Sequence, residues 1–289
     1  MSPMKILVTG ATGFVGRHLV RALLDNGCSV RAVARNAQTA ARMPWINEVE
    51  FIAADVHAPL LDVAQLTHGV DALAHLAWPG LPNYQGLFHF EQNLFADYSF
   101  IKRAVEAGVK QVMVTGTCFE YGPQSGPLGE DTAPAPDNPY GLAKNTLRQF
   151  LEHLQVSQPF TLQWARLFYL YGEGQNPNSL LAALDRAIDA HEPHFNMSGG
   201  EQLRDYLPVE QAAGGLASLL RCREFSGVVN CCSGEPIAVR TLVERHVQSR
   251  NATIALNLGH YGYPAHEPMA FWGTTERLHS LKSRIEVGQ

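Results

Sequence analysis

The sequence predicts an α/β fold: a doubly wound parallel sheet over residues 1–170, followed by a smaller C-terminal lobe over residues 171–289. In the first part, short apolar runs alternate with stretches of helical periodicity, the pattern of a parallel sheet wrapped by helices. Beyond about Tyr171 this alternation weakens, and glycine and proline become more frequent. We expect some segments of the second part to return to the sheet of the first.

The composition is that of a soluble globular protein, with 46% hydrophobic and 17% charged residues. The net charge of -5 provides no electrostatic footprint for nucleic acid. The N-terminus lacks the long apolar region of a signal peptide, and no apolar stretch is long enough to span a membrane. The five cysteines form no Cys-x-x-Cys pair, and the twelve histidines show no metal-ligand spacing. We therefore predict a cytoplasmic protein with reduced thiols, no metal, and no nucleic-acid or membrane partner.

The first strand and helix are well defined in the sequence. Residues 5–9 form an apolar run that favours a strand. Residues 14–26 favour a helix, because Val15, Leu19 and Leu23 recur on one face. Gly27 follows at the position where a glycine commonly ends a helix.

The later elements continue the alternation. Further strands are expected at residues 29–34, 49–54, 71–77, 111–115 and 161–167, and further helices at residues 88–107 and 140–154. Gly108 is placed to end the first of these helices, and Pro139 fits the start of the second.

The loop between the first strand and the first helix is rich in glycine. Gly10 allows a tight turn, Gly13 allows the backbone to approach a pyrophosphate, and Gly16 allows the helix to pack closely on the strand. Free N–H groups at the helix start face the phosphates. The strand–turn–helix context favours a dinucleotide site of the Rossmann type over a purely structural turn. The predicted contacts from this loop are Gly10, Thr12, Gly13, Phe14, Val15 and Gly16.

The end of the second strand bears on the choice of cofactor. Proteins that bind NAD usually carry an acidic residue there, bonded to the ribose hydroxyls. Here the strand ends in Ala34-Arg35-Asn36, without an acid. A guanidinium suits a 2′-phosphate, so Arg35 favours NADP(H). A plain surface arginine is the alternative.

Tyr140 and Lys144 form a Tyr-x-x-x-Lys pattern on a predicted helix. Residues four apart lie on one helix face. A free tyrosine has a pKa near 10. A neighbouring ammonium should lower that pKa and make Tyr140 an acid–base group, while Lys144 could also bond the cofactor ribose.

The Gly-x-x-Gly-x-x-Gly spacing, combined with this Tyr-Lys pair, resembles the extended short-chain dehydrogenases/reductases, the NAD-dependent epimerase/dehydratase family. The resemblance extends over nearly the whole chain. It implies that Asp55 and Val56 contact the adenine, and that Leu76 and Ala77 of the His75-Leu76-Ala77 motif lie beside the cofactor.

The resemblance also implies a third catalytic residue and a set of substrate contacts. Thr117 takes the position of the family's catalytic Ser/Thr, whose hydroxyl holds the carbonyl oxygen of the substrate. Arg204, in an Arg-Asp-Tyr-x-x-Val motif, could bridge two phosphate oxygens. The aromatic residues that follow the fourth strand could line the sugar pocket or simply pack the loop. The implied substrate contacts are Trp78, Tyr84, Thr117, Cys118, Phe119, Asn178 and Arg204.

Two positions narrow the reaction class. Sugar dehydratases of the family carry an Asp-Glu pair directly after the catalytic threonine, where this chain has Cys118 and Phe119. The cysteine of GDP-fucose-synthase-like epimerases would align with Phe119. We therefore interpret Cys118 as a small apolar pocket residue.

Within the family, the resemblance is to the 4-ketoreductases of nucleotide-linked sugars. It implies NADPH-dependent reduction of the C4 ketone of a 4-keto-6-deoxyhexose linked to a nucleoside diphosphate, with dTDP as the expected nucleotide, in deoxysugar biosynthesis. A homodimer is expected. The alternatives are a nucleotide-sugar epimerase with tightly held NAD and a non-catalytic, NADP-sensing Rossmann protein.

Overall fold

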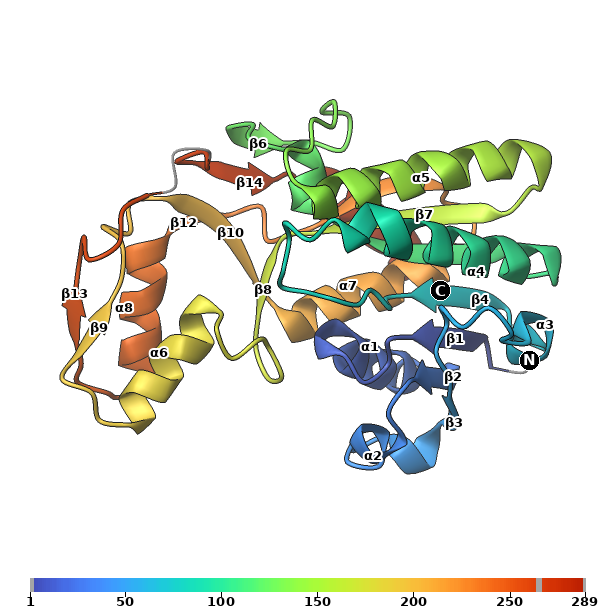
Figure 1. The fold of residues 1–289 in the computed structure, drawn as a ribbon, viewed down its shortest axis with the longest axis horizontal. Helices are drawn as coiled ribbons and strands as arrows, with labels where there is room; N and C mark the ends of the chain where they lie inside the picture. The colour runs from blue at the N-terminus through green and yellow to red at the C-terminus, as the bar shows by residue number, and fades with distance from the viewer. Residues whose placement is uncertain (1–2, 264–266, 288–289) are drawn as a thin grey trace.

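The computed structural model describes residues 3–263 and 267–287. Its centre is a parallel sheet of seven strands in the order β11-β7-β5-β4-β1-β2-β3 (Figure 1). From one edge to the other, these strands are β11 (Gly227–Cys231), β7 (Thr161–Leu167), β5 (Gln111–Thr117), β4 (Ala72–His75), β1 (Lys5–Thr9), β2 (Ser29–Ala34) and β3 (Glu50–Ala53).

The order of the strands reverses beside β1. Val8 of β1 pairs with Ala32 on one side and with Ala74 on the other. A crevice forms outside the carboxyl ends of parallel strands at such a reversal, and ligands of doubly wound folds bind there. The predicted Rossmann-type α/β fold is therefore confirmed.

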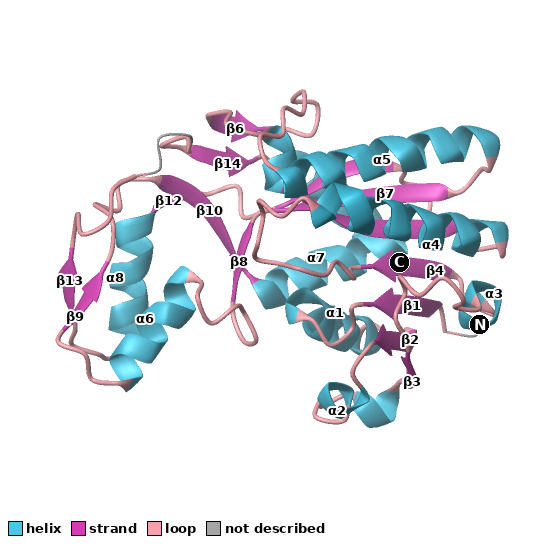
Figure 2. Cartoon of the chain, viewed as in Figure 1, coloured by secondary structure: helices cyan, strands magenta, loops and turns pink. Residues whose placement is uncertain are grey.

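Helices cover both faces of the sheet, as Figure 2 shows. Alternate residues of β1 point to opposite faces: Val8 packs with one cluster of apolar side chains, and Leu7 packs with another. The first cluster joins the sheet to α1 (Phe14–Asp25) and α7 (Val209–Arg221). The second joins it to α4 (Leu94–Glu106) and α5 (Pro139–Ser157).

The helix ends follow local sequence signals. Helix α1 ends at Asp25 with Asn26 as its cap, and Gly27 then adopts a φ of +73°. Helix α5 begins after Asn138, whose side chain accepts a hydrogen bond from the Gly141 N–H, with Pro139 in the first turn. Tyr140 therefore stands on the first turn of a well-capped helix.

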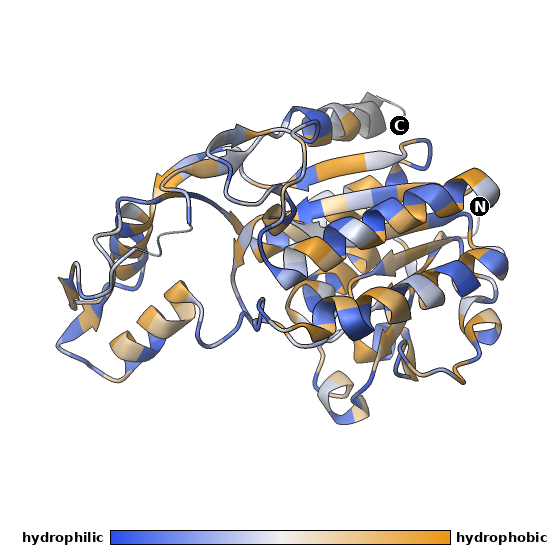
Figure 3. Ribbon diagram, turned by 45° about the horizontal axis from the view of Figure 1, so that its top comes forward, coloured by the Kyte–Doolittle hydropathy of each residue, from blue (hydrophilic) through white to orange (hydrophobic). Residues whose placement is uncertain are grey.

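Much of the C-terminal part forms a separate group of smaller elements, on the left of Figure 1. Helices α6 (Leu180–Asp189) and α8 (Val239–Ser249) share an apolar cluster of their own. Figure 3 shows hydrophobic and hydrophilic residues interspersed along them. The small sheets pair β8 (Tyr169–Tyr171), β10 (Leu203–Pro208) and β12 (Pro236–Ala238); β6 (Gly126–Leu128) and β14 (Phe271–Gly273); and β9 (His194–Asn196) and β13 (Ala255–Asn257).

The structure differs from the sequence prediction in some elements. The helix expected over residues 88–107 begins with a π-helical turn at His89–Asn93 before α4. The short helices α2 (Ala37–Ala40) and α3 (Val63–Thr67) were not predicted, and neither were the short turns at Ile46–Glu48 and Cys118–Tyr121. Strand β11, helix α7 and helix α9 (Glu276–Val287) come from beyond residue 170 and lie with the central sheet, to which the sequence analysis expects some later segments to return. None of the helices in the described ranges is long and apolar enough to cross a membrane.

Candidate active site

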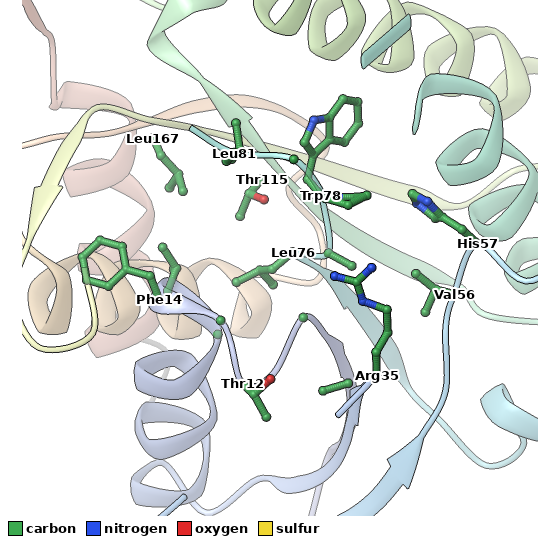
Figure 4. Close-up of a pocket in the computed structure, with 18 of the residues that line it drawn as sticks. Thr12, Phe14, Arg35, Val56, His57, Leu76, Trp78, Leu81, Thr115 and Leu167 are labelled. Atoms are coloured by element: carbon green, nitrogen blue, oxygen red, sulfur yellow. The ribbon is translucent and has the colours of Figure 1, made fainter. Parts of the chain in front are cut away.

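A cavity of about 620 Å³ lies at the point where the strand order reverses (Figure 4). Its walls come from the glycine loop, the ends of β2, β3, β4 and β5, and the start of α5. Every residue that the sequence predicts to bind the cofactor lines this cavity, and so do Trp78 and Tyr84. The remaining predicted substrate residues do not: Thr117, Cys118, Phe119, Asn178 and Arg204.

The glycine loop forms a close-fitting cradle on the floor of the cavity. Gly10 has a φ of +66°, and a Cβ there would lie 2.8 Å from the Ala77 nitrogen. A Cβ on Gly16 would lie 2.1 Å from the Gly10 oxygen, so α1 can start this close to the loop only with glycine. The first-turn N–H groups of α1 have no partner within the helix and can hold phosphate oxygens. The cradle therefore fits the pyrophosphate of a dinucleotide.

The Thr9 hydroxyl joins the ends of β1 and β4 beneath this cradle. Its oxygen accepts hydrogen bonds from the N–H groups of Leu76 (3.2 Å) and Ala77 (3.3 Å). Its hydroxyl lies 3.0 Å from Nδ1 of the fully buried His75. The His75-Leu76-Ala77 segment is thereby fixed against the glycine loop.

Arg35 extends from the end of β2 into the same cavity, as Figure 4 shows. Its side chain is exposed. Within residues 3–263 and 267–287, no carboxylate pairs with it. The guanidinium is therefore available to an anion in the cavity.

Lys144 is fully buried on α5, one helical turn after Tyr140. Its Nζ donates a hydrogen bond to the Thr115 carbonyl (2.9 Å) and lies 3.9 Å from the centre of the Trp78 ring. Burial lowers the pKa of Lys144 to about 8, although the charges of Asp97 and Glu120 act in the opposite direction. The lysine thus remains a cation at neutral pH, with two groups fixing its position.

Tyr140 is 7% exposed and surrounded by aromatic rings. The Tyr84 ring lies 5.6 Å away, the His89 ring 5.2 Å and the Trp78 ring 5.9 Å. Burial raises the pKa of Tyr140 above its usual value, and a hydrogen bond with the Thr117 side chain lowers it. The sequence led us to expect that Lys144 would lower this pKa; in the structure, the lowering influence comes from Thr117, and desolvation outweighs it. The phenol therefore stays protonated and is suited to donate a proton.

Thr117 ends β5 and starts the short turn that leads to Tyr121. The Thr117 hydroxyl accepts a hydrogen bond from the Phe119 N–H, and the backbone N–H of Thr117 donates one to the Glu120 carboxylate (2.9 Å). This is a capping box, which the Thr-x-x-Glu pattern could have indicated. Thr117 is thus held in place, with its hydroxyl beside Tyr140.

Glu120 is a supporting residue that the sequence analysis missed. It is fully buried and also accepts hydrogen bonds from Trp164 Nε1 (2.9 Å) and Arg166 Nε (2.8 Å) on β7. The pairing of β5 with β7 brings these side chains together from more than forty residues apart. Glu120 therefore anchors the Thr117 turn to the sheet.

The loop after β4 covers Tyr140. Trp78 Nε1 donates to His89 Nδ1 (2.9 Å), and the Tyr140 N–H donates to the Tyr84 carbonyl (3.2 Å). The Tyr84 ring also lies 4.9 Å from that of Phe119. Trp78 and Tyr84 thus both pack the loop and line the cavity.

Cys118 is buried, and desolvation raises its pKa to about 12, so it remains a thiol. This agrees with a packing role rather than that of a nucleophile or an acid in the working pH range.

Arg204 and Asn178 lie outside the cavity. Arg204 is 3% exposed, stacks on Phe271 and pairs with Glu267 (3.2 Å). Asn178 is exposed just before α6. Asp205, which follows Arg204 in the chain, accepts hydrogen bonds from the backbone N–H groups of Ser233 and Gly234, so it orients the backbone.

The described residues contain no cluster of His, Cys, Asp or Glu side chains arranged to hold a metal ion.

Comparisons with known proteins agree with this geometry. The family model described as "NAD dependent epimerase/dehydratase family" matches residues 6–232. The dTDP-6-deoxy-L-talose 4-dehydrogenase (NAD(+)) of Aggregatibacter actinomycetemcomitans is 31% identical over 272 residues, which cover 93% of this chain and 99% of the relative. A UDP-glucose 4-epimerase of Halalkalibacterium halodurans is 28% identical over 83% of this chain and 79% of its own.

Solved structures share the fold. MoeE5 in complex with UDP-glucose and NAD is 26% identical, with a TM-score of 0.80 over 96% of this chain and 92% of its own. The UDP-glucose-4-epimerase of Stenotrophomonas maltophila, with bound NAD and formylated UDP-arabinopyranose, has a TM-score of 0.87 over 97% of this chain and 92% of its own. Because the identity is only 20%, this similarity supports the fold and not a shared function.

Proposed function

The chain belongs to the NAD dependent epimerase/dehydratase family, and from this premise we propose that it reduces the C4 ketone of a nucleoside-diphosphate-linked 4-keto-6-deoxyhexose with NADPH. It is an enzyme of the NAD(P)-dependent oxidoreductase type. The observation that carries the proposal is the buried Tyr140 phenol, which lies beside the Thr117 hydroxyl and one helical turn before the buried Lys144 cation.

Each of these residues has a role in a ketone reduction. When bound, the nicotinamide cofactor would supply the hydride. The ketone oxygen gains negative charge as C4 is reduced, and Tyr140 gives it a proton. The Thr117 hydroxyl donates a hydrogen bond to the same oxygen. Lys144, fixed by the Thr115 carbonyl and the Trp78 ring, stabilises the phenolate that remains.

Residues beyond Thr117 support reduction over the other reactions of the family. Cys118 and Phe119 stand where dehydratases carry an Asp-Glu pair, and Phe119 stands where an epimerase cysteine would lie. The A. actinomycetemcomitans relative is named as a 4-dehydrogenase, which acts at the same sugar carbon. Its name also supports dTDP as the nucleotide in our proposal. The intact Tyr-Lys pair and the family membership set aside the non-catalytic alternative.

The substrate and assembly are part of the same proposal. We place the diphosphate near Arg204 and Asn178, which requires Arg204 to exchange its contact with Glu267 for phosphate oxygens. The division into a cofactor domain over residues 1–170 and a mainly substrate-binding lobe over residues 171–289, a homodimer and a cytoplasmic location complete the proposal.

A screen of 4-keto-6-deoxyhexoses linked to dTDP, CDP, GDP and UDP tests the reaction. We expect one NADPH to be oxidised per sugar reduced, with the dTDP sugar the best substrate. The number of 4-epimerases among the relatives makes an epimerase the second candidate. Sugar interconversion without net NADPH oxidation, by a protein purified with NAD bound, would favour the epimerase and contradict the proposal.

Replacing Arg35 by alanine tests the NADP(H) preference. Arg35 stands at the end of β2 and forms no ion pair with any described residue. The A. actinomycetemcomitans relative, by contrast, is named for NAD(+). Loss of one phosphate contact should lower kcat/KM for NADPH roughly 10- to 100-fold and leave that for NADH nearly unchanged.

The matched control is Arg42→Ala. Arg42 is an exposed arginine just after α2 that does not line the cavity, and its replacement should leave both values unchanged. A wild-type preference for NADH, or a preference unaffected by Arg35→Ala, would show that Arg35 does not select the cofactor.

A further inference from the structure

His57 is a histidine of the cavity wall that the reaction does not use. It follows Asp55 and Val56 at the end of β3 and lines the same cavity as Arg35. Figure 4 shows both side chains beside Val56. The His57 side chain is 18% exposed, so one edge of its ring reaches the cavity while the rest is buried.

Behind His57 lies a fully buried carboxylate. His57 Nε2 is 2.6 Å from Oδ1 of Asp97 on α4, and the Asp97 side chain is 0% exposed. His75 Nε2 lies 3.1 Å from the same oxygen. The second oxygen, Asp97 Oδ2, is buried and has no hydrogen-bond partner among the described residues.

His75 lies between Thr9 and Asp97. Because the Thr9 oxygen already accepts two backbone N–H groups, its single proton is free to go to His75 Nδ1. His75 Nε2 then faces the same Asp97 oxygen that His57 contacts. The carboxylate lies nearer to His57 than to His75, so His57 is the histidine best placed to balance its charge.

The charged groups around His57 support this assignment. Burial disfavours the charged ring, but the hydrogen bond to Asp97 and the charges of Asp97 and Asp55 outweigh it and raise the pKa of His57 above its usual 6.5. Arg35 opposes this shift. His75, His57 and Lys144 together hold the pKa of Asp97 below its usual value despite its burial. With Nε2 bonded to Asp97, the second ring nitrogen of a charged His57 is left as a donor.

We propose that His57 and Arg35 together form the subsite for the 2′-phosphate of NADP(H), with Asp97 as the positioning residue that orients His57. This rests on the NADP(H) part of the proposed function. A phosphate dianion carries three acceptor oxygens, which one guanidinium cannot satisfy alone. Arg35 reaches it from the end of β2, and His57 reaches it from the end of β3, the neighbouring strand.

The proposal predicts that selection for the 2′-phosphate depends on pH. His57 carries its charge below its raised pKa and loses it as the pH rises through that value. Affinity for a 2′-phosphorylated ligand should therefore fall with rising pH, while affinity for the same ligand without the phosphate should not. Because the second pKa of a phosphate is about 6, the comparison belongs between about pH 6.5 and 9.

Calorimetric titration of the full chain with 2′,5′-ADP and with 5′-AMP tests the subsite without any turnover. The ratio of the two affinities should favour 2′,5′-ADP and fall with rising pH. His57→Gln, which can still hydrogen-bond Asp97, should lower the ratio about 10-fold near pH 6.5 and remove its pH dependence. His57→Lys should restore the affinity ratio, and the ratio should then stay constant with pH. Asp97→Asn should make the affinity ratio fall at a lower pH, because the Asp97 carboxylate no longer raises the pKa of His57.

His68→Gln is the matched control, because His68 is an exposed histidine outside the cavity; it should behave as the wild type. A His57→Gln protein with an unchanged ratio and pH profile would overturn the His57 subsite while leaving the Arg35 assignment standing. Equal weakening of 5′-AMP would also overturn it, because His57 would then act on the adenosine. A wild-type ratio near one would instead refute the NADP(H) preference itself.

Discussion

Replacing Tyr140 by phenylalanine should lower turnover by roughly 10²–10⁴-fold while cofactor affinity changes little. The substitution keeps the ring, and with it the contacts to Tyr84, His89 and Trp78, but removes the only O–H of this side chain. Because that group is protonated at neutral pH, its loss removes the proton donor rather than a weak nucleophile. Single-turnover rates and cofactor titration measure the two effects separately.

Tyr98→Phe is the matched control for this experiment. Tyr98 lies on α4, packs against Phe150 and does not line the cavity, so removing its hydroxyl should leave turnover unchanged. If Tyr140→Phe turned over at close to the wild-type rate, Tyr140 would have no part in proton transfer.

Replacing Glu120 by glutamine should lower the free energy of unfolding by about 3–5 kcal/mol. Glu120 is the buried anion that pairs with Arg166, itself 1% exposed, and it accepts the Trp164 and Thr117 N–H groups. Glutamine keeps the shape but leaves the Arg166 cation buried without its counter-charge. Urea unfolding followed by circular dichroism measures the change.

Glu152→Gln serves as the comparison, because Glu152 pairs with Arg148 on the surface of α5 and its side chain is 44% exposed. Its replacement should have a much smaller effect, since exposed ion pairs contribute little. A Glu120→Gln protein as stable as the Glu152→Gln protein would mean that the buried pair does not anchor the Thr117 turn.

Six strands of the central sheet and the floor of the site could be predicted from the sequence because their signals are local, whereas the edge strand β11 was not predicted. Strands β1, β2 and β7 have the bounds that their apolar runs indicate. The glycines at positions 10, 13 and 16 have a fixed spacing relative to the first strand, so the cradle follows from that spacing alone.

The supporting contacts could not be predicted, because they join residues far apart in the sequence. Glu120 meets Arg166 only when β5 pairs with β7, and His57 meets Asp97 only when α4 packs on the sheet. The pKa of Tyr140 depends on burial, which a Tyr-x-x-x-Lys spacing does not reveal. The C-terminal lobe is built of strands as short as three residues, too short for a periodic signal.

Deuterium transfer tests the proposed reaction most directly. The enzyme is incubated with NADPH deuterated at C4 of the nicotinamide and with a dTDP-linked 4-keto-6-deoxyhexose, and the product is examined by NMR. We expect deuterium at C4 of the sugar, in an amount equal to the NADPH consumed. Deuterium at another sugar carbon, or sugar conversion with no net NADPH consumption, would contradict the assignment of this chain as a 4-ketoreductase.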